Sequence, residues 1–270
     1  MPLITLSSDF EKQSYGCGAM EGLIYELCPA ARVIHHHHGI AGFDLLQAAR
    51  SMETLVTMPI GIHVCVVDPG VGTKRRCIGI RVKRGDLLIG PDNGLFRPAA
   101  RLLGGIAEVR ELANPKYQRR PVSPIFHGRD IFAAAAGHLA SGVPLADFGP
   151  SLPEKDLNPA PYEDAVIEGN KIHATVIHLN RFGTLFFNIL KETWDRFGVP
   201  LGGKVTLSKG GKRLTLTHTR TFGDVPVGKP CIMKDDYTRV EAAINQGSLL
   251  KRFPVKIGDR VTLKSGGPAE

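Results

Sequence analysis

The feature that most constrains the fold is a change of hydrophobic pattern near residue 150. Before it, apolar strand-like runs alternate with segments whose apolar residues recur at helical spacing. After it, short β-like runs follow one another between glycine-rich turns. The segment between the two patterns contains Pro150, Pro153, Pro159 and Pro161. This proline density favours an extended connector, so we predict domains at residues 1–149 and 163–270, joined by a linker at 150–162.

The first half has the pattern of an α/β domain. Residues 62–67 are almost wholly apolar, as in a strand that is covered on both faces. We predict strands at 3–7, 31–35 and 62–67, helices at 19–27, 43–52 and 131–139, and a hairpin at 78–82 and 87–89. Because strands alternate with helices, we expect a mostly parallel sheet sandwiched by helices.

The second half has the pattern of a small β domain. The predicted strands are 165–167, 174–179, 204–207, 213–218 and 261–263. Glycine-rich turns such as Lys209-Gly210-Gly211-Lys212 separate them. This spacing predicts a small all-β domain, either a barrel or a sandwich.

Composition narrows the class of protein. The net charge is +8, but Lys and Arg are scattered and form no motif of interleaved aromatic and basic residues, so we predict no nucleic-acid partner. No apolar run is long enough for a membrane span, and the N-terminus does not resemble a secretion signal, so we expect a cytoplasmic protein without a membrane partner. The five cysteines form no CxxC pair, which argues against a disulfide framework and a zinc site.

Three ionisable residues in glycine-rich turns, Asp68, Arg75 and His127, are the first candidates for chemistry. In open α/β sheets ligands bind beyond the carboxyl ends of strands, where Asp9 and Asp68 lie. Asp68 opens the run DPGVGTKRR, in which Arg75 is close enough to fold back and pair with it. His127 lies in FHGRDIF, just before a predicted helix. Alone, each is more often a turn aspartate or a structural histidine, but together these loops favour an active site.

Several sequence blocks carry a family resemblance. They are SSDF, VVDPGVGTKRR, GPDNGLF and FHGRDIFAAAAGHLA in the first half, and RFGTLFFNI, TFGDVPVGKP and VEAAINQGS in the second. In this order and spacing they resemble the S-adenosylmethionine hydroxide adenosyltransferase family, which is homologous to fluorinase and chlorinase. The resemblance covers nearly the whole chain, and its second-half match is the looser one.

The resemblance implies a fold, an assembly and a reaction. The fold would be an N-terminal α/β domain with a C-terminal β-barrel, assembled as a homotrimer whose active sites lie at subunit interfaces. Water or hydroxide would attack the adenosyl C5′ of S-adenosylmethionine and release adenosine and methionine, with no cofactor besides this substrate. Asp68, Arg75 and His127 match the water-handling triad, with Asp9 on the ribose hydroxyls and Phe43 against the sugar. Which triad member activates the water is open.

The resemblance also implies substrate contacts. Gly128 stands where fluorinase carries a halide-contacting serine, which favours water as the nucleophile. The substrate-binding positions that match in the second half are Asn180, Thr184, Phe186, Phe222 and Asn245. The alternative for Phe186 is an ordinary place in the barrel core.

Some positions depart from the family pattern. Ser14 replaces a second ribose-region aspartate, Asn180 an aspartate that holds the methionine ammonium, and Thr184 an asparagine that touches adenine. An amide cannot make the charge-assisted bond of a carboxylate to that ammonium. Two alternatives therefore stay open: a halogenase-like enzyme that uses S-adenosylmethionine, and a non-catalytic adenosyl-ligand binding protein with altered methionine recognition.

Residues 35–38 are four consecutive histidines. On a regular strand neighbouring side chains point to opposite faces, which makes neighbours poor joint ligands of a metal. We therefore expect a strand end and predict no metal, and the role of the run is open.

Overall fold

The computed structural model describes residues 1–266. Two compact units result, one from Met1 to Pro161 and one that begins at Tyr162. The expected connector is held against the first unit, because the Glu111 N–H donates to the Pro150 carbonyl and the Leu152 N–H to the Val109 carbonyl. None of the described helices is long and apolar enough to span a bilayer.

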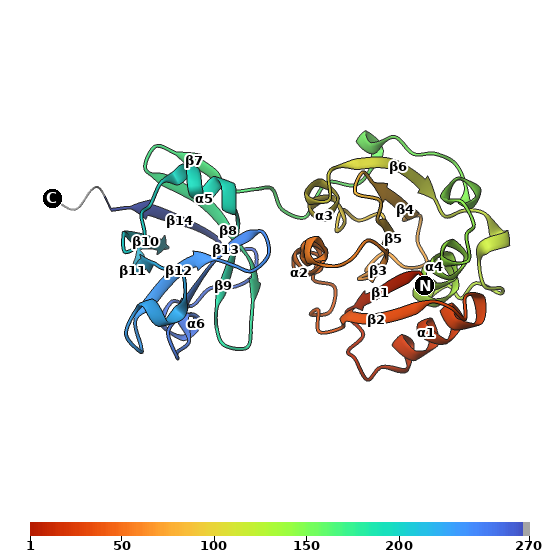
Figure 1. Cartoon of the computed structure of the whole chain (residues 1–270), viewed down its shortest axis with the longest axis horizontal. Helices are drawn as coiled ribbons and strands as arrows, with labels where there is room; N and C mark the ends of the chain where they lie inside the picture. Colours follow the sequence, from red (N-terminus) through yellow and green to blue (C-terminus); the bar gives the residue numbers. More distant parts are fainter. Residues whose placement is uncertain (267–270) are drawn as a thin grey trace. The chain divides into compact units, whose positions relative to one another are not determined.

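The first unit contains a six-stranded sheet with the order β2-β1-β3-β5-β4-β6 (Figure 1). Its strands are β1 (Leu3–Ser8), β2 (Arg32–His37), β3 (Ile62–Val66), β4 (Cys77–Val82), β5 (Leu87–Pro91) and β6 (Ile106–Glu111). Strands β2, β1, β3 and β5 are parallel neighbours, whereas β4 runs antiparallel to β5 and β6. The predicted mostly parallel sheet is confirmed.

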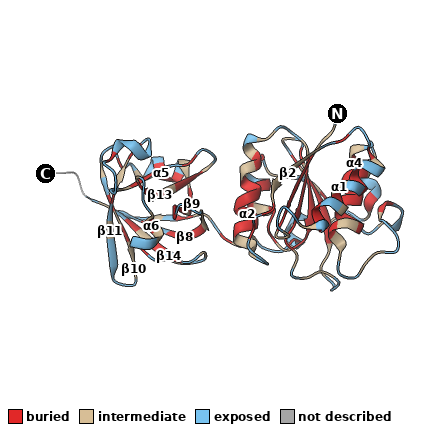
Figure 2. Cartoon of the chain, turned by 90° about the horizontal axis from the view of Figure 1, so that it is seen from below, coloured by how far each residue is buried: buried red, intermediate tan, exposed pale blue. Residues whose placement is uncertain are grey.

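Helices cover both faces of this sheet (Figure 1). Helices α1 (Tyr15–Leu27) and α4 (Ala134–Ala140) pack on the face that carries Ile62, Val64 and Val66 of β3. Helices α2 (Leu45–Glu53) and α3 (Arg97–Leu102) pack on the opposite face. All five residues of β3 are buried, as the apolar run predicted, and in Figure 2 the buried sheet lies between the helices.

Two elements of this unit lack a clear sequence signal. Strand β6 is at the sheet edge, where the charged residues of IAEVRE are partly exposed, and α3 has only six residues. A π-helix, η3 (Gly128–Ala133), precedes α4, so the helix predicted at 131–139 begins earlier than expected. The short 3-10 helices of the chain are η1 (Thr54–Thr57), η2 (Pro115–Tyr117), η4 (Leu145–Phe148), η5 (Glu154–Asp156) and η6 (Phe222–Asp224).

The second unit contains a closed seven-stranded barrel and a short eighth strand that pairs with one of the barrel strands. The barrel strands are β8 (Lys171–Leu179), β9 (Leu185–Leu190), β10 (Lys204–Lys209), β11 (Lys212–His218), β12 (Pro230–Lys234), β13 (Arg239–Ile244) and β14 (Arg260–Ser265). Pairing of β14 with β8 closes the barrel, and β7 (Val166–Glu168) also pairs with β8. The predicted barrel is confirmed.

Two helices interrupt the barrel strands, so this unit is not built of strands alone. They are α5 (Lys191–Phe197) and α6 (Leu249–Arg252). Trp194 of α5 is fully buried and joins the barrel core, which explains why the helix follows β9 so closely. The alternating pattern alone predicted neither these helices nor strands β9, β12 and β13.

Candidate active site

Asp68 and Arg75 form an ion pair beyond the carboxyl end of β3. Arg75 Nε donates to Asp68 Oδ1 at 3.0 Å, and Arg75 Nη2 donates to Asp68 Oδ2. Both side chains are more than 90% buried. The loop between them needs Gly72, whose φ is +74° and where a Cβ would lie 2.4 Å from the Pro124 carbonyl oxygen. The glycine-rich turn thus folds Arg75 back onto Asp68, as the sequence predicted.

His127 completes this group from the start of η3. Arg75 Nη2 lies 3.2 Å from His127 Nδ1. Because a guanidinium can only donate, Nδ1 accepts and the ring proton is on Nε2. Burial, and then the positive charge of Arg75, lower the pKa of His127 below its ordinary value. The group therefore contains a neutral imidazole whose Nε2–H remains available to donate.

Every N–H of the Arg75 guanidinium has an acceptor. Besides Asp68 and His127, Arg75 Nη1 donates to the Arg76 carbonyl at 3.1 Å and to Cys77 Sγ at 2.8 Å. A guanidinium has five N–H groups, and these contacts use all of them. Arg75 therefore holds the side chains of Asp68 and His127 in place and has no donor left for a ligand.

Asp9 lies at the same edge of the sheet. Strand β1 is parallel to β3, with Ser8 opposite Val66, so Asp9 and Asp68 both follow the carboxyl ends of adjacent strands. Asp9 Oδ2 accepts the N–H of Phe43 at 2.9 Å. Phe43 has φ of +63° and its side chain is 70% exposed. The structure thus brings Asp9 and Phe43 into direct contact.

Gly128 packs closely on β3. A Cβ at this position would lie 3.1 Å from Val66 Cγ1 and 3.4 Å from the sulfur of Met20. A larger residue would require these buried neighbours to move by a few tenths of an ångström. Gly128 therefore allows the segment with His127 to pack closely against the sheet, and it has no side chain that could donate a hydrogen bond.

Asn180 and Thr184 lie in the loop between β8 and β9. Asn180 Oδ1 accepts the N–H groups of Phe182 and Thr184, each at 3.0 Å. Its oxygen is therefore engaged within its own loop, which leaves the NH₂ group as the other polar group of the amide. Thr184 is buried. The Leu250 N–H donates to the Gly183 carbonyl, which ties this loop to the segment that contains Asn245.

Phe186, Phe222 and Asn245 complete the candidates in the barrel unit. Phe186 is half-buried and contacts the ring of His178 at 5.1 Å, and it is not among the buried residues of the barrel core. Phe222 begins η6 and is 45% exposed. Asn245 Nδ2 donates to the Val225 carbonyl at 2.7 Å, which fixes the loop that carries Phe222.

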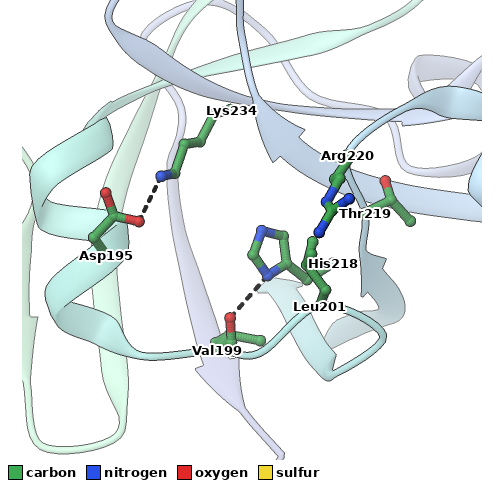
Figure 3. A pocket seen from close by; sticks show the side chains of 7 residues that line it. All are labelled: Asp195, Val199, Leu201, His218, Thr219, Arg220 and Lys234. Atoms are coloured by element: carbon green, nitrogen blue, oxygen red, sulfur yellow. Dashed lines mark hydrogen bonds and ion pairs between the residues drawn. The ribbon is translucent and has the colours of Figure 1, made fainter.

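A pocket of about 470 Å³ opens elsewhere in this unit (Figure 3). It is lined by Asp195, Val199, Leu201, His218, Thr219, Arg220 and Lys234, and no residue predicted from the sequence is among them. Lys234 pairs with Asp195 at 2.6 Å. His218 contacts the Val199 carbonyl through Nδ1 and accepts from Trp194 through Nε2. Asp195, His218 and Lys234 are therefore engaged within the protein, whereas the buried Thr219 hydroxyl has no hydrogen-bond partner among residues 1–266.

Each histidine of the run at 35–38 has a polar partner. His36 lies between Ser7 and Thr54, and His37 contacts Ser51. His35 contacts Glu21 and His38, and His38 contacts Ser8. A register shift between Leu6 and Ser7 in the pairing of β1 with β2 makes the expected strict alternation of these side chains wrong. Among residues 1–266 no group of three or more potential metal ligands is arranged to hold an ion.

The sequence matches one family over both units. Residues 4–149 match the SAM hydroxide adenosyltransferase N-terminal domain, and residues 174–262 match the SAM hydroxide adenosyltransferase C-terminal domain. The chain belongs to this family.

Several relatives align along nearly their whole length. The (R)-S-adenosyl-L-methionine hydrolase of Salinispora arenicola is 34% identical over 98% of both chains. That of Thermus thermophilus is also 34% identical, over 95% of this chain and 97% of the relative. The fluorinase of an Actinoplanes species is 24% identical over 97% of both. An uncharacterized conserved protein from Thermotoga maritima superimposes with a TM-score of 0.91, at 29% identity over 97% of this chain and 99% of that one.

The departures from the family pattern have structural explanations of different kinds. Ser14, in place of the second ribose-region aspartate, is the N-cap of α1 and accepts the Gly16 N–H. It therefore has a local structural task that suits a serine. Asn180 keeps the loop-closing oxygen that an aspartate would also supply, and only its second polar group differs.

Proposed function

We propose that this protein hydrolyses S-adenosylmethionine to adenosine and methionine. The observation that carries the proposal is the closed hydrogen-bonded group of Asp68, Arg75 and His127 at the carboxyl end of β3. Support also comes from family membership and from the hydrolases that are 32–34% identical to this chain. The group contains one acceptor and one donor for a water molecule, held by a guanidinium that is otherwise fully engaged.

The proposed step forms a bond between the water oxygen and C5′ while the bond between C5′ and sulfur breaks. The electron pair of that bond goes to sulfur, which leaves as the neutral thioether of methionine and needs no acid. One water proton must be accepted. His127 cannot accept it through Nε2, because Nε2 already carries a proton. We therefore assign Asp68 as the proton acceptor and His127 as the donor that orients the water oxygen.

Arg75 acts in this mechanism as the organising residue. It fixes the plane of the Asp68 carboxylate through two bonds and the tautomer of His127 through a third. Because the pair is buried, the water faces few competing hydrogen-bond partners, which favours in-line attack.

The remaining candidates are proposed as substrate contacts. Asp9 would accept the ribose hydroxyls, and Phe43 would cover the sugar. The contacts proposed for the barrel unit are Asn180, Thr184, Phe186, Phe222 and Asn245. Gly128 offers no hydroxyl to a halide, which supports water rather than chloride or fluoride as the nucleophile.

A second candidate is a non-catalytic adenosyl-ligand binding protein. The observation that favours it is the Asn180 amide, whose oxygen is engaged within the loop and whose NH₂ group would face a ligand ammonium unfavourably. Tight binding of S-adenosylmethionine without turnover distinguishes this candidate from the hydrolase.

We also propose an assembly and a setting. The family resemblance implies a homotrimer with active sites at subunit interfaces and no cofactor besides the substrate. The charge distribution and the lack of long apolar runs in the sequence support the absence of a nucleic-acid or membrane partner and a cytoplasmic location. The exposure of Phe43 and Phe182, 70% and 64% in the single chain, supports burial by another copy. Light scattering of the purified protein tests it, and a monomeric mass contradicts it.

The decisive experiment follows adenosine formation from S-adenosylmethionine in ¹⁸O-labelled water. We expect adenosine with ¹⁸O at C5′ from the wild-type protein, and at least about a 10²-fold lower rate from Asp68→Asn and His127→Gln. Asp147→Asn, on the surface, and His138→Gln, on α4, are the matched controls. Parallel reactions with chloride and fluoride detect any 5′-halo-adenosine. Absence of adenosine formation by the wild-type protein overturns the proposal.

A further inference from the structure

A continuous hydrogen-bonded chain runs from the surface of α1 to the end of β1. Glu21 Oε2 lies 3.0 Å from His35 Nε2, His35 Nδ1 lies 2.8 Å from His38 Nε2, and His38 Nδ1 lies 2.7 Å from Ser8 Oγ. Exposure falls along it: the Glu21 side chain is 33% exposed and that of His35 25%, whereas His38 and Ser8 are buried. The chain therefore connects a surface carboxylate with the interior of the first unit.

Each hydrogen bond of this chain is donated in the same direction, from Ser8 towards Glu21. The Glu21 carboxylate can only accept, so His35 donates to it through Nε2–H, and in the neutral form of the ring His35 accepts through Nδ1. His38 then donates through Nε2–H and accepts the Ser8 hydroxyl through Nδ1. Ser8 Oγ in turn accepts the Phe10 N–H at 3.2 Å. Two neutral imidazoles satisfy every step, and the carboxylate at the outer end selects this direction.

The inner end of the chain holds the turn that carries Asp9. Ser8 and Phe10 flank Asp9 and are linked through the Ser8 hydroxyl. The His38 carbonyl also accepts the Glu11 N–H at 3.1 Å. Glu11 itself has φ of +65°, an unfavourable conformation for a residue with a side chain, so the turn needs such external contacts. His38 thus contacts the turn with both its ring and its backbone.

An irregularity of the sheet makes the chain possible. Leu6 pairs with His35, but Ser7 pairs with His37, so His36 is an extra residue in β2. On a regular strand residues three apart face opposite sides, and the extra residue allows His35 and His38 to meet on one side. His36 and His37 contact the segment from α2 to η1 instead. The four histidines thus divide into two pairs with different neighbours.

We propose that Glu21, His35 and His38 are positioning residues for Asp9, which they orient through Ser8 and the turn at residues 8–11. The proposal rests on the proposed function, in which Asp9 accepts the ribose hydroxyls. Among the described residues, this hydrogen-bonded chain from Glu21 to Ser8 makes no bond with Asp68, Arg75 or His127. Loss of these hydrogen bonds should therefore weaken nucleoside binding and leave the chemical step nearly unchanged.

The test compares Glu21→Ala with Glu26→Ala, which removes an exposed glutamate from the same helix. We expect Glu21→Ala to raise the dissociation constant of adenosine and the KM for S-adenosylmethionine about tenfold. The kcat should change less than twofold. Glu21→Gln should bind nearly as the wild type, because its amide oxygen can still accept from His35. Calorimetry with adenosine and steady-state kinetics provide these values.

Nitrogen-15 NMR of the histidine rings provides a readout that does not depend on turnover. In the wild type His38 should carry its proton on Nε2, and Glu21→Ala should give a mixture of tautomers while Glu26→Ala does not. Equal adenosine affinity in the two alanine variants, or a loss confined to kcat, overturns the positioning role alone. Failure of the wild type to bind adenosine overturns the positioning role together with the proposed function.

Discussion

The end of β3 and the loop between β8 and β9 share one type of hydrogen bonding but differ in which groups supply the donors. In each, a side-chain oxygen group accepts two N–H donors. At Asp68 the donors belong to the side chain of Arg75, and the carboxylate keeps its charge and its outer lone pairs. At Asn180 the donors belong to the backbone of its own loop, and what remains is a neutral NH₂ group. In the proposed function the first arrangement prepares a group for proton transfer, and the second shapes a surface that recognises the substrate.

Burial separates the two regions further. The side chains of Asp68 and Arg75 are nearly excluded from solvent, whereas Phe182 and Phe222 are exposed in the single chain. A buried charged pair keeps its geometry without a ligand, and exposed loop aromatics acquire theirs on contact. We therefore expect substitutions at the end of β3 to change kcat and substitutions in the barrel loops to change KM.

The largest effect should follow from Arg75→Gln. It leaves the Asp68 carboxylate without its cation and His127 Nδ1 without the donor that fixes its tautomer. We expect kcat to fall about 10²- to 10³-fold with a smaller change in KM. Arg76→Gln is the control, because the Arg76 side chain pairs with Asp92 and has no bond to the side chains of Asp68, Arg75 or His127. A fall in kcat below tenfold in Arg75→Gln, or an equal fall in the control, would contradict the expectation that substitutions at the end of β3 act on kcat.

The sequence predicts this first region well because its determinants are local. The apolar run at 62–67 places the strand, and the glycines after Asp68 favour a tight turn. The pairing of Asp68 with Arg75 is therefore determined by residues that lie close together in the sequence. His127 is different, since 52 positions separate it from Arg75. The motif FHGRDIF marks His127 as a candidate, but its place at the pair depends on how η3 packs against β3, which no local pattern specifies.

Features that depend on tertiary context escaped the sequence pattern. The edge strand β6 contains partly exposed charged residues, and β13 contains two alanines with little β preference, so neither gives a strong strand signal. The extra residue His36 in β2 arises from its pairing with β1. Four identical side chains give no local sign of where such a shift occurs.

A smaller effect is expected from Asn180→Asp. The new carboxylate can accept the same two backbone N–H groups and would offer its second oxygen, with a negative charge, to a ligand ammonium. We expect KM for S-adenosylmethionine to fall about tenfold, which corresponds to roughly 1.4 kcal/mol, with kcat nearly unchanged. Asn170→Asp, in the exposed turn before β8, controls for the added charge. An unchanged KM would mean that the loop does not contact the amino-acid end of the substrate.

The smallest effect concerns stability in acid and separates the two units. Burial, with smaller contributions from His37 and His63, lowers the pKa of His36 to about 4. An unfolded chain takes up that proton near pH 6.5, so the folded state loses stability as the pH falls from 6.5 towards 4. We expect a loss on the order of 1 to 2 kcal/mol at pH 5 from this residue, or a few degrees in Tm.

His36→Gln tests this expectation, because an amide can replace the ring's donor and acceptor but does not titrate in this range. The difference in Tm between pH 7 and pH 5 should be smaller in the variant than in the wild type. Hydrogen exchange at pH 5 should reveal opening of β2 and α2 before the barrel strands, since His36 joins β2 to the segment after α2. The prediction is contradicted if the Tm difference between pH 7 and pH 5 is equal in variant and wild type, or if the barrel strands open first. His36 would then not determine the loss of stability of the first unit in acid.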